Sequence, residues 1–285
     1  MTQIPSSAQV IEGFVQNDDV RIHFCTVGRG PLLLLLHGFP DNAETFEYQM
    51  RDLSSDYQVV CPTLRGYPPS DIPDEVASYG LAVVMQDILA VLDHFNVEKA
   101  ILGGHDFGGA VIQHMAFLHP SRIAGLIIIN SPILPTFNQL VNFDKEQQNL
   151  SQYTIRYHQY QAGDPIDEEY IVRTIRDPAR RRVVQEYLAS SSIYGMLNYY
   201  KKNYPSPPYG KEVDTSRMMY NIPTLIIWGL QDEYFSLKVL DNLPLYFRDT
   251  LRLVTLPSAG HWSFRDEYAK VNREIRSWLE ELKHV

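Results

Sequence analysis

The residue with the clearest potential for chemistry is Asp106, at the apex of the glycine-rich turn GGHDFGG. The turn follows the short apolar run Ala100–Leu102 and leads into Ala110–Leu118, where apolar residues recur at helical spacing. This order of strand, sharp turn and helix is the geometry of a nucleophile elbow. Because so tight a turn crowds its neighbours, we expect no room for side chains at three of its glycines. They are Gly104, Gly108 and Gly109.

A carboxylate at the apex, in place of a hydroxyl, indicates displacement at a saturated carbon, because aspartate is ionised near neutral pH and needs no base to activate it. Two further acid–base residues, Asp232 and His261, follow the apolar runs Ile222–Gly229 and Thr250–Leu256. The carboxyl ends of parallel strands share one edge of a sheet, so all three residues can converge there. Their order predicts a triad in which Asp232 orients His261 and His261 activates water.

Strands that alternate with helices predict the frame that positions these residues. Leu32–Leu36 is apolar on both faces, as expected for a central parallel strand. Val10–Val15 and Val20–Val27 alternate in polarity and are typical of an antiparallel hairpin at an edge. Strands and helices then alternate as far as Ile123–Ile129. The sequence therefore predicts an α/β fold with a mostly parallel, doubly wound sheet.

The alternation stops between residues 133 and 220, a segment without apolar strands that contains eleven of the eighteen tyrosines. We expect a helical cap inserted into one core, with the core formed by residues 1–132 and 221–285. Within the expected cap, a basic run is more typical of a solvated face than of an anion site. The run consists of Arg173, Arg176, Arg180, Arg181 and Arg182.

Composition narrows the classes of partner. The chain has 285 residues, 45% of them hydrophobic, which is enough for a sizeable core. Its formal net charge of −9 disfavours nucleic acid or an anionic membrane as a partner and favours a small neutral substrate. No apolar run is long enough to span a bilayer. Residues 1–7 lack the basic head and apolar stretch of a signal peptide.

The cysteines and histidines predict neither a disulfide nor a metal site. Cys25 and Cys61 each lie in a predicted strand and are expected to be buried and reduced, which makes the cytoplasm the default compartment. The histidines outside the triad show no metal-ligand spacing with cysteine or carboxylate partners, so we expect no metal and no cofactor. These histidines are His23, His94, His114, His119, His158 and His284.

Two motifs resemble those of epoxide hydrolases, a cap-bearing group of the α/β-hydrolase superfamily. The sequence HGFP at His37–Pro40 is similar to the oxyanion-hole motif of that group, and Gly104–Gly109 is similar to its aspartate elbow. The elbow departs from the family pattern at Phe107, where tryptophan is common. The resemblance implies an oxyanion hole and a substrate pocket. The hole would use the backbone N–H groups of Phe39 and Phe107, and the pocket residues would include His37, Pro40 and Trp262.

Enzymes of this group also place two cap tyrosines against the epoxide oxygen. The contexts of Tyr157 and Tyr200 resemble those of the two tyrosines, and the neighbouring Tyr160 and Tyr199 are close enough to be mistaken for them. A neutral phenol, with an unperturbed pKa of about 10, can donate a hydrogen bond or a proton to the alkoxide that ring opening releases. The tyrosines and Asp106 would then act from opposite sides of the ring.

The resemblance therefore implies an enzyme that converts an epoxide and water to a vicinal diol through an alkyl ester on Asp106, which water activated by His261 and Asp232 then hydrolyses. The expected substrate is small and apolar, and the protein is expected to be a monomer or homodimer. Two alternatives remain: a dehalogenase that uses the same aspartate against a carbon–halogen bond, and a non-catalytic ligand-binding protein on the same fold.

Several residues bear on these alternatives. Haloalkane dehalogenases typically have tryptophan after the nucleophile and asparagine or glutamate in the HGxP motif, where this chain has Phe107 and Phe39. Haloacetate dehalogenases use arginines beside the elbow, where this chain has Phe107 and Ala110. Asn130 stands where some relatives place the triad acid, but an amide carries no charge, which favours Asp232. His105 is expected to be a structural hydrogen-bonding residue.

Overall fold

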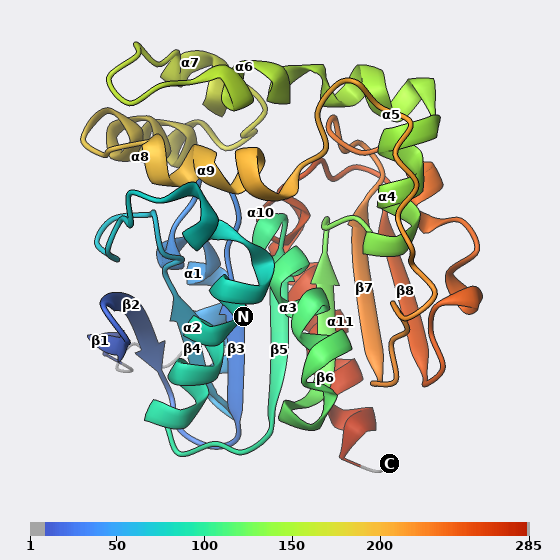
Figure 1. The fold of residues 1–285 in the computed structure, drawn as a ribbon. Coiled ribbons are helices and arrows are strands. Elements are labelled where there is room, and N and C mark those ends of the chain that lie inside the picture. Colours follow the sequence, from blue (N-terminus) through green and yellow to red (C-terminus); the bar gives the residue numbers. More distant parts are fainter. Residues whose placement is uncertain (1–8, 284–285) are drawn as a thin grey trace.

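The computed structural model describes residues 9–283 (Figure 1). The signal-peptide expectation for residues 1–7, and His284, lie outside the described part. Eight strands form one sheet in the order β1-β2-β4-β3-β5-β6-β7-β8. The strands are β1 (Ile11–Asn17), β2 (Val20–Val27), β3 (Leu32–Leu36), β4 (Gln58–Pro62), β5 (Ala100–His105), β6 (Ile123–Ile129), β7 (Thr224–Gly229) and β8 (Leu251–Leu256).

The centre of the sheet is parallel and buried on both faces, because helices cover each side. Leu33–Leu36 of β3 are 0% exposed, and β3 pairs in parallel with β4 and β5. At one edge, β1 and β2 pair antiparallel, and β2 is also antiparallel to β4. The predicted fold class, the central strand and the edge hairpin are confirmed.

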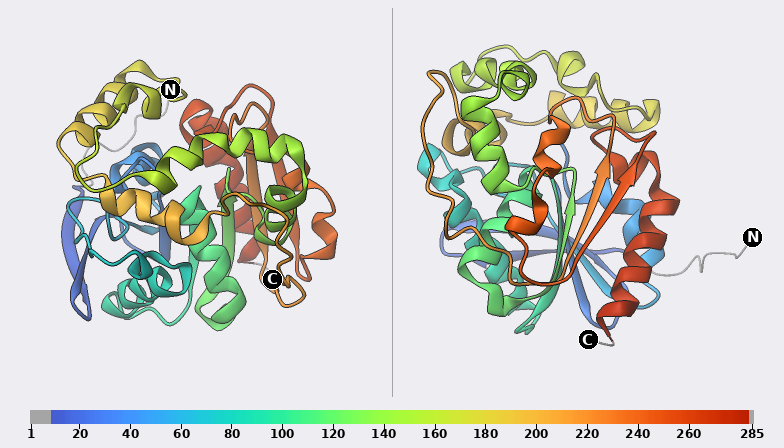
Figure 2. Two further views of the ribbon diagram at one scale, coloured as in Figure 1. Left: turned by 45° about the horizontal axis from the view of Figure 1, so that its top comes forward. Right: turned by 90° about the vertical axis from the view of Figure 1, so that its right-hand side faces the viewer.

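Helices cover both faces of the sheet. Figure 2 shows α11 on one face and α2 and α3 on the other. In α11 the buried residues Val271, Ile275, Trp278 and Leu279 recur at helical spacing, so one stripe of the helix packs on the sheet. Glu267 separates α11 from the short helix α10 before it. The helices outside the expected cap are α1 (Glu47–Leu53), α2 (Leu81–His94), α3 (Phe107–Leu118), α10 (Ser263–Asp266) and α11 (Tyr268–Leu282).

The segment expected to form a cap contributes six helices between β6 and β7. They lie together over one end of the sheet, at the top of Figure 1. They are α4 (Leu134–Phe143), α5 (Lys145–Leu150), α6 (Thr154–Gln159), α7 (Glu168–Val172), α8 (Pro178–Ala189) and α9 (Tyr194–Asn203). Among residues 9–283, no helix has the length and apolar character needed to cross a membrane.

Short 3-10 helices complete the connections. They are η1 (Ala43–Phe46), η2 (Val76–Tyr79), η3 (Pro120–Arg122), η4 (Ser151–Tyr153), η5 (Leu237–Leu240) and η6 (Leu243–Leu245). Both cysteines lie in strands, Cys25 in β2 and Cys61 in β4, and both are buried and free, as expected.

Candidate active site

Asp106 stands between the end of β5 and the start of α3, with φ of 51° and ψ of −123°. A non-glycine residue at positive φ is strained, and such strain persists only where the surroundings enforce it. Here a Cβ on Gly104, Gly108 or Gly109 would come within 2.6 Å of a neighbouring atom, which confirms that no side chain fits at these positions. Ser131 Oγ donates a hydrogen bond of 2.8 Å to the backbone oxygen of Asp106 and holds the turn from the other side.

Two backbone N–H groups hold the carboxylate of Asp106. Phe39 N donates to Oδ1 over 3.0 Å, and Phe107 N also donates to the carboxylate. The loop that carries Phe39 can approach because Gly38 has no side chain: a Cβ there would lie 2.4 Å from Oδ1 of Asp106. Burial alone would raise the pKa of Asp106, but His261 and the Phe107 N–H hold it below its ordinary value. Asp106 is therefore an ionised carboxylate with Oδ1 fixed and Oδ2 available.

His261 lies between two carboxylates. Its Nδ1 is 2.8 Å from Asp232 Oδ2, and its Nε2 is 3.7 Å from Asp106 Oδ2. Burial disfavours the imidazolium, but the charges of Asp232 and Asp106 outweigh burial and raise the pKa of His261 to about 10. The three residues predicted to converge at the edge of the sheet are therefore in contact, with His261 protonated while Asp106 carries its charge.

The charge of His261 gives a pH-dependent prediction. Asp106→Asn is expected to lower the pKa of His261 from about 10, because only Asp232 is left to stabilise the imidazolium. The neutral ring should then be populated at lower pH than in the wild type. Titration of the ring nitrogens by NMR measures this change, and Asp93→Asn, in the exposed ion pair with Arg122, is a control. An unchanged His261 pKa in Asp106→Asn would contradict the coupling.

Asp232 is oriented by Asn130, the residue that stands where some relatives place the triad acid. Asn130 Nδ2 donates to Asp232 Oδ2 over 2.7 Å, while Asn130 Oδ1 accepts from Gly229 N over 3.0 Å. The backbone N–H of Tyr234 donates to the other carboxylate oxygen over 2.8 Å. Asn130 is thus a hydrogen-bond donor that positions the acid. Its place at the end of β6, next to β7, is the signal that could have indicated this role.

Tyr157 of α6 and Tyr200 of α9 face Asp106 from the helices above the sheet. Their ring centroids are 4.8 Å apart, and both residues line a cavity together with Asp106 and His261. Burial raises the pKa of both phenols well above the ordinary value, so both keep their protons at neutral pH. The two hydroxyls are therefore available as donors.

The neighbouring tyrosines are placed differently. Tyr199 is fully buried, and its hydroxyl donates to the backbone oxygen of Arg65 over 3.0 Å. Tyr160 ends α6 and does not line the cavity at Asp106. Phe107 takes part in the pocket instead, with its ring 4.8 Å from that of Tyr200. The geometry separates Tyr157 and Tyr200 from these neighbours.

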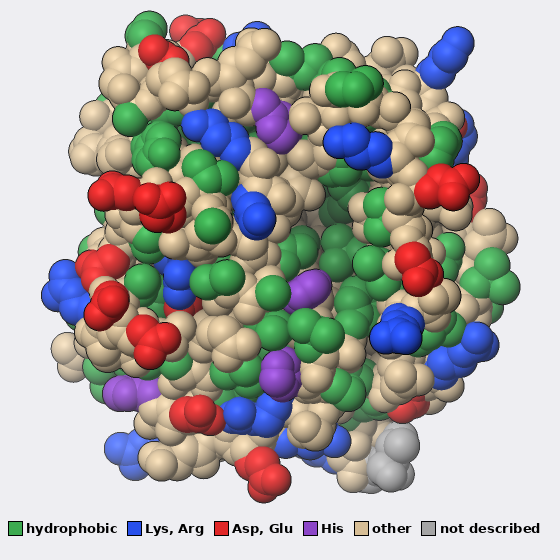
Figure 3. Space-filling view, viewed as in Figure 1, with side chains coloured by type: hydrophobic (Ala, Val, Ile, Leu, Met, Phe, Trp, Pro, Cys, Tyr) green, Lys and Arg blue, Asp and Glu red, His purple; other side chains and the backbone are tan. Residues whose placement is uncertain are grey.

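Two cavities meet at Asp106. The first, of about 10 Å³, is just large enough for one water molecule. Pro40 and Trp262 line it, whereas His37 does not. The second, of about 440 Å³, is lined by Asp106 and Phe107 and by mainly apolar residues, several of them from α3 and α4. Figure 3 shows a hollow with hydrophobic walls on the face below the six helices. A third cavity, of about 870 Å³, lies away from Asp106.

His37 and His105 support the site from behind. His37 is fully buried, with Nδ1 2.9 Å from Gly38 O, and its Nε2 accepts from Leu64 N over 3.0 Å. Burial lowers the pKa of each ring to about 4, so both are neutral. His105 Nε2 lies 3.1 Å from the backbone oxygen of His261, as expected of a structural hydrogen-bonding residue. Through its contacts with Gly38 O and Leu64 N, His37 holds the HGFP loop in place.

A buried ion pair joins α8 to the loop after the HGFP motif. Arg180 Nη2 lies 2.7 Å from Asp41 Oδ1, and Trp262 Nε1 donates to Asp41 Oδ2 over 2.7 Å. Arg180 is only 7% exposed, so the prediction that the run 180–182 is a solvated face is wrong for this residue. The period of the α8 helix turns Arg180 inward and leaves Arg182 exposed.

Arg180→Met is expected to lower the free energy of unfolding by about 3–5 kcal/mol, because it leaves the buried carboxylate of Asp41 without its cation. Urea unfolding measures the change. Arg182→Met is the matched control, since Arg182 is exposed and its loss should change stability by about 0.5 kcal/mol at most. Equal stability of the two variants would show that the ion pair does not stabilise the fold.

The chain is similar to known proteins over most of its length. Residues 31–268 match the model of the family described as alpha/beta hydrolase fold. Epoxide hydrolase 3 of Xenopus tropicalis is 28% identical over 300 residues, covering 98% of this chain and 80% of the relative. Epoxide hydrolase 4 of Homo sapiens is 27% identical over 289 residues, covering 94% and 78%. The crystal structure of Bacillus megaterium epoxide hydrolase in complex with an inhibitor matches with a TM-score of 0.82 at 25% identity, covering 94% of this chain and 100% of that chain. With the sheet order, the elbow and this match over most of its length, the chain belongs to the α/β-hydrolase fold family.

Proposed function

We propose that this protein is an epoxide hydrolase that adds water to a small apolar epoxide and releases a vicinal diol. The observation that carries the proposal is the position of Asp106, an ionised carboxylate between a buried His261–Asp232 pair and two phenols that keep their protons. The relatives named epoxide hydrolases support it, because they align over most of this chain.

In the first step, Asp106 Oδ2 attacks a ring carbon, since Oδ1 is held by Phe39 N. The carbon–oxygen bond of the ring breaks, and Tyr157 or Tyr200 donates a proton to the alkoxide. Esterification removes the charge of Asp106 and so lowers the pKa of His261. The imidazolium then gives up the proton that restores the phenol. In sum, one proton passes from His261 through the phenol to the alkoxide, and the step is balanced.

In the second step, neutral His261, held by Asp232, takes a proton from water as the water attacks the ester carbonyl. The carbonyl oxygen is Oδ1, which already accepts from Phe39 N, so the developing oxyanion meets donors that are in place. The ester bond breaks, the diol leaves with the proton from His261, and one oxygen of water remains on Asp106. The second proton of that water passes from the Asp106 carboxyl group to His261, which restores the carboxylate and the imidazolium. The diol thus carries an oxygen that belonged to the protein.

The surroundings of Asp106 favour an epoxide over a halide as the reacting group. A halide leaving group needs N–H donors, but the cavity presents phenols, and the indole N–H of Trp262 is engaged by Asp41. The mainly apolar walls of the cavity of about 440 Å³ support an apolar substrate.

The same proposal covers the organisation of the chain. Residues 133–220 act as a cap on a core of residues 1–132 and 221–285, since the cap supplies both phenols. The protein acts as a monomer or homodimer without a cofactor. We place it in the cytoplasm, where two free thiols such as Cys25 and Cys61 persist.

One turnover in heavy-oxygen water, with enzyme in excess over a styrene-type epoxide, tests the function. The expected diol contains no solvent oxygen, and the label is found on Asp106 in a digest of the protein. Solvent oxygen in the first-turnover diol would overturn the ester mechanism. Halide release from a haloacid or haloalkane, without turnover of any epoxide, would make the protein a dehalogenase.

A further inference from the structure

We propose that Glu12, His23 and Cys25 form a binding site for one zinc ion on the edge hairpin. The site is independent of the proposed reaction, because these residues belong to β1 and β2 and line neither cavity at Asp106.

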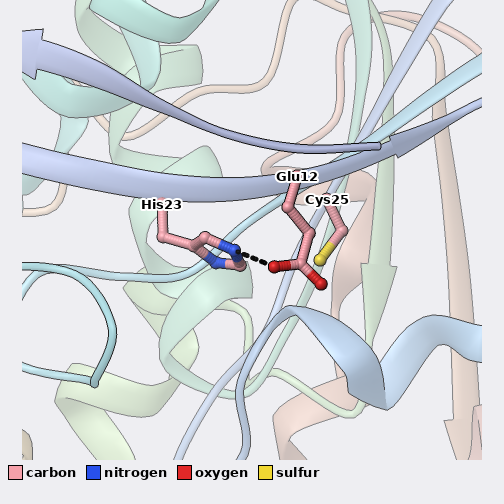
Figure 4. Close-up of side chains that lie close together, drawn as sticks. All are labelled: Glu12, His23 and Cys25. Carbon is pink, nitrogen blue, oxygen red and sulfur yellow. Dashed lines mark ion pairs between the residues drawn. The ribbon is translucent and has the colours of Figure 1, made fainter. Parts of the chain in front are cut away.

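The pairing of β1 with β2 brings the three side chains to one face. Glu12 is directly opposite Cys25 in the antiparallel register, and His23 is two residues before Cys25 on the same strand. One donor atom from each residue lies within 4.8 Å of the others, and His23 Nε2 is 3.6 Å from Glu12 Oε2. Figure 4 shows the imidazole and the sulfur of Cys25 on either side of the Glu12 carboxylate.

The imidazole of His23 is oriented as a ligand. Its Nδ1 lies 3.0 Å from Thr63 Oγ1, and a proton on Nδ1 that is donated to this oxygen leaves a lone pair on Nε2. Nε2 is buried and has no hydrogen-bond partner in the part of the chain that the structure describes. His23 is only 6% exposed, and this nitrogen points toward Glu12. A buried nitrogen that lies 3.6 Å from a carboxylate oxygen, with no hydrogen-bond partner among the described residues, leaves its lone pair free for a ligand.

The donor set suits zinc. Sulfur, imidazole nitrogen and carboxylate oxygen are its common ligands in proteins, and the thiolate and carboxylate together neutralise its two charges. On binding, the thiol proton of Cys25 passes to solvent. Donors in a tetrahedral zinc site lie about 3.5 Å apart. Glu12 can close the remaining gap, because its side chain is 68% exposed, whereas His23 and Cys25 are held in the sheet.

The fourth ligand and the path of entry come from the cavity of about 870 Å³. Glu12, Cys25 and Glu44 all line it, so water or the Glu44 carboxylate can complete the coordination. With three protein ligands and an open fourth position, zinc would link β1 to β2 at the outer edge of the sheet.

Titration of the full-length, tag-free protein with zinc, after removal of metals by a chelator, tests the site. Calorimetry is expected to show one zinc per chain, with affinity reduced roughly 100-fold or more in Glu12→Gln and Cys25→Ala, because even changes behind a ligand typically cost about 10–100-fold. Glu12 is exposed, so its variant should fold normally. Cys61→Ala is the matched control for the buried thiol and should bind as the wild type does.

Cobalt provides a second measurement, because a thiolate ligand gives this ion a charge-transfer absorption band. The band is expected in the wild type and in Cys61→Ala, and it should be absent in Cys25→Ala. The proposal is overturned if the wild type binds no stoichiometric zinc, if Glu12→Gln binds as tightly as the wild type, or if the band depends on Cys61.

Discussion

Replacing His261 with glutamine is expected to stop the reaction with one substrate attached to Asp106. Attack by the ionised carboxylate and donation by the phenols do not involve His261, and a proton from solvent can restore the phenol in its place, so the ester still forms. Its hydrolysis needs a base, and loss of a positioned base typically slows such a step by about 10²–10⁴-fold. After exposure to an epoxide, mass spectrometry of the intact protein should show an increase equal to one substrate, and a digest should place it on Asp106.

The matched control is His119→Gln, which changes a histidine remote from the cavities at Asp106 and should turn over like the wild type. The double variant His261→Gln/Asp106→Asn should gain no mass, because the nucleophile is absent. If His261→Gln gained no mass under conditions where the wild type forms diol, the covalent route would be excluded.

Removal of both phenol hydroxyls, in Tyr157→Phe/Tyr200→Phe, is expected to slow formation of the ester itself by roughly 10³-fold or more. The estimate follows from the loss of one donor to a developing oxyanion, which typically costs about 10²–10³-fold. Each single variant should retain part of the rate, because the two hydroxyls line the same small cavity. Rapid mixing in the His261→Gln background measures ester formation alone.

Tyr160→Phe is the control for this pair, since Tyr160 is also at the end of α6 but does not line the cavity. It should form the ester at the rate of the parent protein. An equal loss in Tyr160→Phe, or a normal rate in the double variant, would show that Tyr157 and Tyr200 do not assist ring opening.

Much of the fold could be predicted because the residues of single segments indicate their local structure. The five leucines of β3 are apolar on both faces, which only a covered parallel strand explains, and the glycines around Asp106 leave one local geometry. The convergence of Asp106, Asp232 and His261 followed from the position of each at a strand end. In each case the relevant contacts were determined by the topology of the sheet.

The features that sequence analysis missed depend on contacts between elements. The ion pair of Arg180 with Asp41 requires the rotation of α8 about its own axis, which a run of three arginines does not reveal. The meeting of Glu12 with Cys25 requires the register of β1 against β2, and a shift by one residue would turn the carboxylate to the other face. For this reason the spacing of ligand residues along the chain does not reveal the cluster of Glu12, His23 and Cys25.

The turn at Asp106 also has a consequence for the evolution of ester cleavage on this fold. The glycine contacts within the turn and the bond from Ser131 hold the backbone of residue 106 without the carboxylate. Serine at this position would keep the backbone and the N–H donors, and it would remove one of the two carboxylate charges that raise the pKa of His261. A serine esterase needs a hydroxyl beside a neutral imidazole. A single amino-acid replacement would therefore supply the hydroxyl and favour the neutral ring, so in evolutionary terms the opening of strained ethers and the cleavage of esters lie close together on this fold.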